Sequence, residues 1–243
     1  MHRKLAKPPL VESVCEVRLN PSAPWDLTIP GRLFEKLQPE FPERRQTLGV
    51  ELKLNSQGLP DPPDYRQIEN LQFLSHDGKS IVQIREHSVS VIRLAPYESW
   101  EKYKPMVVHV FEKFAEVAGN VETARKGLKY TNRIAVPKPE IKLEEYFDLY
   151  PHLGSRLPQR LGPFLVGAIF PFDDSVDLLQ VELTSADPTS PDQYHVILSL
   201  DYYTMDAEGV TFKILPDWLE TAHGRIEETF HATLKEQTMR LFE

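Results

Sequence analysis

The sequence predicts an α+β fold, in which a two-layer antiparallel sheet carries helices packed on one face, and three observations support this class. Two hairpin signals lie between residues 71 and 94, apolar residues alternate along several other segments, and two long segments carry apolar residues at helical spacing. The order strand, short helix, three strands and long helix occurs in residues 1–125 and again in residues 126–243. We therefore expect two tandem β-α-β-β-β-α halves that form one structural unit, with internal duplication as one explanation.

The hairpin segment LQFLSHDGKSIVQIREHSVSVIRL predicts three antiparallel strands. Asp77 and Gly78 favour a type I′ turn, because its two central residues need positive φ. A two-residue loop at this point places Phe73 opposite Val82 on an apolar face. A second turn, after the next strand, brings a third strand onto the same face. The register of both turns thus defines one buried surface.

The opposite face of these three strands is mostly polar, but it carries an apolar row at one end. The row consists of Leu74, Ile81 and Ile92. Because an exposed apolar group on a polar surface is typical of a binding site, we expect this row to contact a protein partner.

Alternation and turn signals predict the remaining elements in order. Strands are expected at residues 10–19, 48–54, 127–136, 164–170, 176–184 and 194–203. Helices are expected at residues 29–38, 100–118 and 143–149, and from an Asp217 N-cap through Leu241. Residues 55–70 and 150–163, rich in proline, are expected to be irregular connections.

Composition narrows the class of protein. The 41% hydrophobic content is enough for a large core, and the net charge of −8 disfavours attraction to nucleic acid or an anionic membrane. Cys15, the single cysteine, excludes an intrachain disulfide. Neither an apolar signal region nor a long apolar run is found, so we expect a cytoplasmic protein that does not contact membranes.

No phosphate loop, nucleophile elbow or metal-spaced cysteine motif is present, so no cofactor and no catalytic residue are expected. Asn132 falls in an inward position of its strand, where an amide is costly unless it is hydrogen-bonded. It either satisfies a bulge or helix end, or lines a ligand pocket. The residues of that alternative pocket are Arg93, Tyr130, Asn132, Arg133 and Trp218.

Three residues spaced four apart on the last helix form a weak candidate for a metal site: His223, Glu227 and His231. A solvated helix face explains this spacing better and is the favoured interpretation. Basic residues that could assemble a local patch for nucleic acid are Arg44, Arg45, Lys126, Lys129, Arg133, Arg156 and Arg160.

Five segments together resemble a sporadically distributed prokaryotic family of chains of this length, with no established activity. They are Pro8–Glu12, Leu74–Gly78, Pro96–Trp100, Leu128–Ile134 and Trp218–Phe230. The resemblance spans nearly the whole chain and carries no catalytic residues across. It implies a role beside prokaryotic defence genes, including accessory positions in type III CRISPR loci.

Three functional hypotheses follow. The first is a non-enzymatic cytosolic interaction or regulatory protein, an accessory of antiviral defence, that binds a protein partner. The second is a ligand-binding or hydrolytic α+β domain with a pocket near Asn132. The third is an RNA-binding accessory protein that uses the local basic residues.

Overall fold

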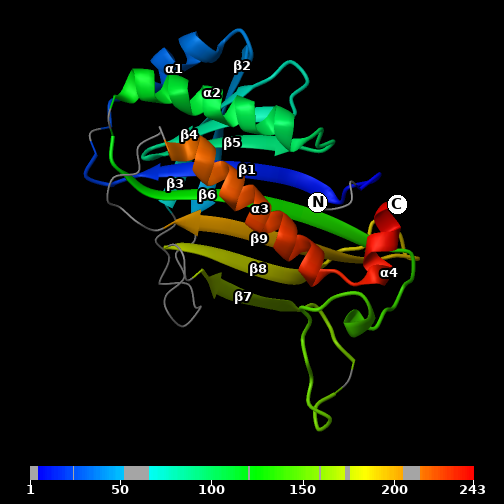
Figure 1. Ribbon diagram of the computed structural model, residues 1–243. Helices are drawn as coiled ribbons and strands as arrows, with labels where there is room; N and C mark the ends of the chain where they lie inside the picture. Colours follow the sequence, from blue (N-terminus) through cyan, green and yellow to red (C-terminus); the bar gives the residue numbers. More distant parts are fainter. Residues whose placement is uncertain are drawn as a thin grey trace.

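The computed structural model describes residues 5–23, 25–51, 66–119, 121–158, 160–172, 176–204 and 214–243. Within these residues the fold is α+β: an open antiparallel sheet of nine strands with helices on one of its faces (Figure 1). The predicted fold class is confirmed. No helix among the described residues combines the length and the apolar character that a membrane span needs.

The sheet has the strand order β2-β3-β4-β5-β1-β6-β9-β8-β7. Its first five strands in the chain are β1 (Leu10–Leu19), β2 (Glu43–Glu51), β3 (Arg66–Leu74), β4 (Ser80–Arg85) and β5 (Ser88–Leu94). The other four are β6 (Thr123–Val136), β7 (Leu165–Pro171), β8 (Asp177–Ala186) and β9 (Tyr194–Thr204). β1 and β6 pair at the centre, and the remaining strands of each half extend outward from them.

Two long helices, α2 (Trp100–Ala118) and α3 (Leu215–Thr233), lie across the same face of the sheet (Figure 1). α1 (Ile29–Leu37) packs beside α2 above the β2 end. The described residues also form the 3₁₀ turns η1 (Leu143–Glu145) and η3 (Arg240–Phe242) and the short α4 (Glu236–Met239). The core lies between the sheet and α2 and α3, because both helices bury their apolar stripes there.

The predicted hairpin register is confirmed. Phe73 lies opposite Val82, and the third strand continues the same buried face. The predicted type I′ turn is wrong, because Gly78 has a positive φ (63°) and Asp77 does not. The loop is longer: Gly78 N–H donates to Ser75 O (2.8 Å), and Ser75 N–H donates to Ser80 O (2.9 Å). Side-chain hydrogen bonds from Ser75 stabilise this wider loop without changing the register.

Several element boundaries differ from those expected. β2 begins at Glu43, and β3 includes residues 66–70, which were predicted as loop; residues 55–65 of that loop lie outside the described residues. The predicted helix at 143–149 is only the 3₁₀ turn η1. α3 begins at Leu215, so Asp217 is inside the first turn and not the N-cap. The helix ends at Thr233, because Leu234 is extended and bridges to Phe147.

The two halves share a topology. In each half the first strand pairs with the last, β1 with β5 and β6 with β9, and the intervening strands continue outward. The first half has the additional strand β2 and the helix α1, whereas the described part of the second half has only η1 between its first two strands. Internal duplication stays a prediction that this repeated order accommodates.

Candidate functional site

A pocket of about 550 Å³ lies where α2, α3 and the centre of the sheet meet. Its floor is formed by Tyr130 and Asn132 of β6, and its walls are the start of α2, one face of α3 and residues 5, 6 and 8–10. Lys7 N–H donates to Phe242 O (3.0 Å), which ties that wall to the C-terminal turn η3. The pocket therefore joins segments from both halves of the chain.

The pocket combines acidic and aromatic side chains. Its lining includes Glu98, Glu101 and Glu227, but no lysine or arginine among the described residues. The aromatic side chains around it are Tyr97, Trp100, Tyr130 and Phe230. Negative charge beside aromatic faces favours a cationic ligand, because ring faces attract cations and carboxylates pair with them.

His223 connects the two long helices at one side of the pocket. Its ring stacks on Trp100 at a centroid distance of 4.2 Å, and its Nδ1 lies 2.9 Å from the Tyr130 hydroxyl, within hydrogen-bond distance. Burial lowers the pKa of His223, although Glu227, Glu220 and Glu101 oppose that shift. The imidazole is therefore neutral near pH 7 and does not cancel the negative charge of the pocket.

Trp100 is held in place from its other end by α3. Its indole N–H donates to Glu220 Oε1 (3.2 Å), and Lys104 Nζ lies 2.5 Å from the same oxygen. Because these contacts and the His223 stack fix the ring, it presents a preformed aromatic surface to the pocket.

Asn132 fits both interpretations of the sequence. It is buried beside a β-bulge between β1 and β6, and its Nδ2 donates to Leu198 O (3.3 Å). The same side chain lines the pocket. Nearby, the Tyr97 hydroxyl is buried and has no hydrogen-bond partner among the described residues. Burial is the main cause that raises the pKa of Tyr97, so its hydroxyl remains a neutral donor beside the pocket.

The weak metal candidate on α3 does line the pocket, with His223, Glu227 and His231 all present. Within the described part of the chain, however, no group of three histidine, cysteine, aspartate or glutamate side chains is arranged to hold a metal ion. His223 is already engaged with Trp100 and Tyr130. The helical spacing therefore contributes pocket lining and gives no support to a metal site.

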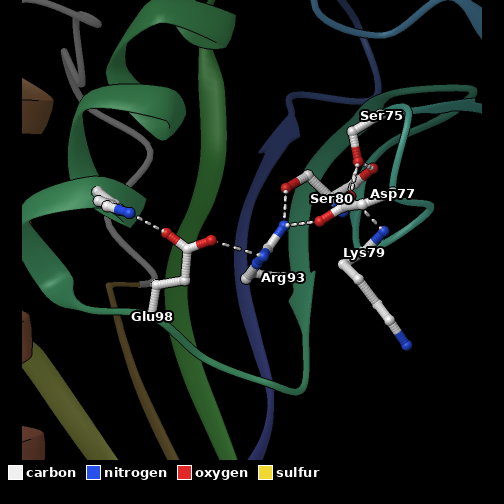
Figure 2. Close-up of polar contacts among 7 residues, drawn as sticks. Ser75, Asp77, Lys79, Ser80, Arg93 and Glu98 are labelled. Atoms are coloured by element: carbon white, nitrogen blue, oxygen red, sulfur yellow. Dashed lines mark hydrogen bonds and ion pairs between the residues drawn. The ribbon is translucent and has the colours of Figure 1, made fainter.

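Arg93 lies outside this pocket, contrary to the predicted set. Figure 2 shows its guanidinium between the hairpin loop and α2: it contacts Asp77 Oδ2 (3.1 Å), Ser80 Oγ (2.8 Å) and Glu98 Oε1 (3.3 Å). It lines a smaller cavity of about 170 Å³ on the other side of Glu98. Arg93 and Lys102 offset the charge of Glu98. Glu227, by contrast, forms no ion pair with any cation of the described residues.

Arg133 and Trp218 are also separate from the pocket. Arg133 is on the opposite face of β6, where it donates to His195 Nδ1 (3.3 Å) and Asp187 O (2.6 Å). The Trp218 indole N–H donates to Asp177 Oδ1 (3.1 Å) in a buried polar cluster. That cluster has a structural role, because Tyr202 and Thr204 bond to the same carboxylate.

The apolar row lies on the outer face of the sheet, where the register predicts it. Leu74 pairs with Ile81, which pairs with Ile92. Leu74 is only 8% exposed and Ile81 only 5%, so the row offers little surface. Its expected role in partner binding is less well supported than the pocket.

The basic residues do not assemble into a single patch. Arg133 lies on the outer face beside His195, and Lys126 is buried beside Trp218. Arg44 lies over Phe34 at the β2 end. These three positions lie in different parts of the sheet and on both of its faces.

Sequence reasoning identified the strand residues of the pocket and placed His223, Glu227 and His231 on one helix face, as a weak metal candidate. It did not assign Tyr97, Trp100, Glu101 or residues 5–10 to the pocket. These come from elements that meet only in the folded chain. The available signals were the Pro8–Glu12 and Pro96–Trp100 segments, which the resemblance singled out and their chemistry did not.

The fold and the pocket define a class: an antiparallel α+β protein with an acidic, aromatic pocket at the junction of its two halves. The chain matches no known family model, and no curated protein shows significant sequence similarity to it.

Proposed function

We propose that the protein is a non-enzymatic interaction protein that holds a lysine or arginine side chain of a protein partner in the pocket. One observation carries this proposal: three glutamates and four aromatic residues line the pocket, without a lysine or arginine among the described residues. A cytosolic accessory role in prokaryotic antiviral defence is the setting that the resemblance implies, and it is part of the same proposal.

The arrangement supports a preformed binding site. Trp100 and His223 are fixed by stacking and hydrogen bonds, so little side-chain entropy is lost when a ligand enters. Glu227 supplies a carboxylate without an ion-pair partner among the described residues, and its contact with a buried guanidinium or ammonium group would be charge-assisted.

A small cationic metabolite is the second candidate, because the same side chains would hold an organic ammonium group. The pocket volume of about 550 Å³ accommodates either ligand. RNA binding is less well supported, because the carboxylates of the pocket repel phosphates and the basic residues elsewhere are dispersed.

The test uses a matched pair of substitutions on α3. Glu227→Gln removes a pocket carboxylate, and Glu228→Gln removes the neighbouring exposed carboxylate, which does not line the pocket. A partner captured from the native host, with nuclease present, should bind the wild type and Glu228→Gln equally and Glu227→Gln at least about tenfold more weakly. Equal capture by all three proteins would overturn the proposal.

Two small probes separate the candidates. Arginine amide should quench tryptophan fluorescence, and citrulline amide, which has nearly the same shape without the charge, should not. Saturable arginine amide binding without any protein partner would favour the metabolite. Capture that disappears on nuclease treatment would favour RNA.

A further inference from the structure

Strand β7 is one edge of the sheet, with β8 as its single neighbour. Ser185 N–H donates to Phe164 O (3.1 Å). This bond shows that residue 164 directs its backbone N–H and C=O groups towards β8. Successive residues of an antiparallel strand direct these backbone groups to opposite sides. Residues 165, 167 and 169 therefore direct their N–H and C=O groups away from β8. No described residue bonds to these outward groups.

The β7 edge lacks the usual protection against pairing. Residues 163–171 carry no charge, and Leu165 (67%), Ile169 (55%) and Phe170 (46%) are unusually exposed for large apolar side chains. Natural edge strands are normally blocked by charges, bulges or a covering helix. A regular, uncharged and exposed edge is instead suited to receiving another strand.

The sequence of this segment is a palindrome in side-chain type. Residues 163–171 read Pro-Phe-Leu-Val-Gly-Ala-Ile-Phe-Pro, with Gly167 at the centre. Antiparallel pairing of two such strands about Gly167 places each side chain opposite one of its own kind. The pairs are Pro163 with Pro171, Phe164 with Phe170, Leu165 with Ile169 and Val166 with Ala168.

We propose that β7 pairs with β7 of a second copy of this chain, antiparallel, around a two-fold axis through Gly167. The outward groups of residues 165, 167 and 169 then form about six backbone hydrogen bonds across the axis. Pro163 and Pro171, which have no N–H to donate, fall opposite one another and bracket the paired stretch. Gly167 also suits the β7–β8 pair, because a Cβ there would lie 3.0 Å from Val181 O.

This pairing commits to one partner because the segment is complementary to itself. No like charges meet across the axis, and exposed apolar groups cover one another on both faces of the joined sheet. The dimer does not depend on the function proposed for the pocket, which lies at the centre of the sheet.

The test exploits the predicted register, in which residue 165 faces residue 169 of the other copy. Sedimentation velocity over a concentration series should give the wild type a mass of twice the 28.0 kDa chain. Leu165→Lys with Ile169→Lys places like charges opposite one another and should raise the dimer Kd at least about tenfold. Leu165→Glu with Ile169→Lys places opposite charges there and should keep the dimer.

A mixing experiment distinguishes loss of the dimer from loss of folding in the charged variants. The double-lysine variant and its double-glutamate counterpart should each be monomeric alone and should form a mixed dimer when combined, which only folded chains can do. A wild type that is monomeric at every concentration, or a double-lysine variant that dimerises like the wild type, would refute the proposal. Failure of the mixed dimer would refute the register.

Discussion

The two ends of the sheet differ in how they are finished. At the β2 end, α1 covers the strands: Phe34 packs on Phe73 at 5.0 Å between ring centroids, and Arg44 lies over Phe34. β2 itself begins with three consecutive charged residues, Glu43, Arg44 and Arg45. At the β7 end no described helix takes the place of α1, the strand is uncharged, and Phe170 is half exposed.

This difference shows that two sheet edges in one chain need not have the same purpose. Charge on an edge strand raises the cost of adding another strand, so β2 has the character of a closed edge. β7 has the opposite character, because desolvating it costs little and covers apolar surface. The predictions below test how far the contrast between the two ends extends.

The largest effect is expected from truncating the packed aromatic residue at the covered end. Phe73→Ala removes a fully buried ring and should lower the free energy of unfolding by about 3–5 kcal/mol. The matched change at the open end, Phe170→Ala in the double-lysine background, should cost less than about 1.5 kcal/mol. Urea denaturation measures both. Similar losses at the two ends would contradict the comparison.

A proline placed along β7 should distinguish its two sides. Ala168→Pro removes an N–H that faces β8 and leaves a carbonyl of β8 unpaired, so the free energy of unfolding should fall by about 1–3 kcal/mol. Ile169→Pro removes an outward N–H and should cost less than about 1 kcal/mol. Thermal denaturation of dilute protein compares them. If Ile169→Pro were more destabilising than Ala168→Pro, the assignment of which backbone groups of β7 face β8 would be wrong.

Lowering the pH should destabilise the region around His223, where the two halves meet. The stability of the β2 and β7 ends of the sheet should change little. The pKa of His223 in the folded protein is below its ordinary value of 6.5, mainly because the ring is buried. The unfolded chain therefore binds more protons as the pH falls below that value, and stability present above it is lost. The urea unfolding midpoints measured at about pH 8 and at about pH 5 should differ less in His223→Asn than in the wild type.

Hydrogen exchange locates this effect. Amides of α3 around His223 should lose protection at the lower pH, whereas those of β3 and β8 should not change to the same degree. His76→Asn, at an exposed loop position, controls for the loss of a histidine as such. An unchanged pH dependence in His223→Asn would exclude His223 as the cause.

The smallest effect concerns the hairpin loop of the first half. Hydrogen bonds from Ser75 and from the Lys79 backbone, together with Arg93, lower the pKa of Asp77 to about 2. The resulting stability is present above the ordinary pKa of 3.8 and is lost as the pH falls towards about 2. Because Asp77 is half exposed, Asp77→Asn should cost less than about 1 kcal/mol at neutral pH. Acid titration followed by circular dichroism should show a shallower loss in the variant.

Strand register was predictable from the sequence because apolar and polar residues alternate along these strands. Only one register places the apolar residues of neighbouring strands together on the buried face. A slip of one residue would turn Phe73 and Val82 to the outer face and Leu74 to the core, at a large cost in buried apolar area. The turn type was not predictable in the same way. Asp77 accepts hydrogen bonds from the Ser75 hydroxyl and from Lys79 N–H, and Ser75 Oγ accepts one from Ser80 N–H. These bonds stabilise a four-residue loop that keeps the same pairing.

Only the site residues that lie on a single strand could be predicted to be close together. Tyr130 and Asn132 share an inward phase, and Arg133 could have been excluded because its neighbour in the strand points to the other face. Trp100 and His223 meet only because α2 and α3 lie side by side, which neither helix encodes alone. The palindrome around Gly167, in contrast, is visible in the sequence, but its meaning depends on knowing that β7 is an edge.

The hydrogen bond between Lys7 and Phe242 has a consequence for biosynthesis. Residues 5–10 form a wall of the pocket and are tied to the turn at residue 242. Every strand of the sheet precedes residue 205, so a ribosome can release a nearly complete sheet while α3 and that turn are still unmade. The pocket is thus completed only after residue 242 has been made, so a nascent chain that has emerged only as far as β9 would not present it to a partner.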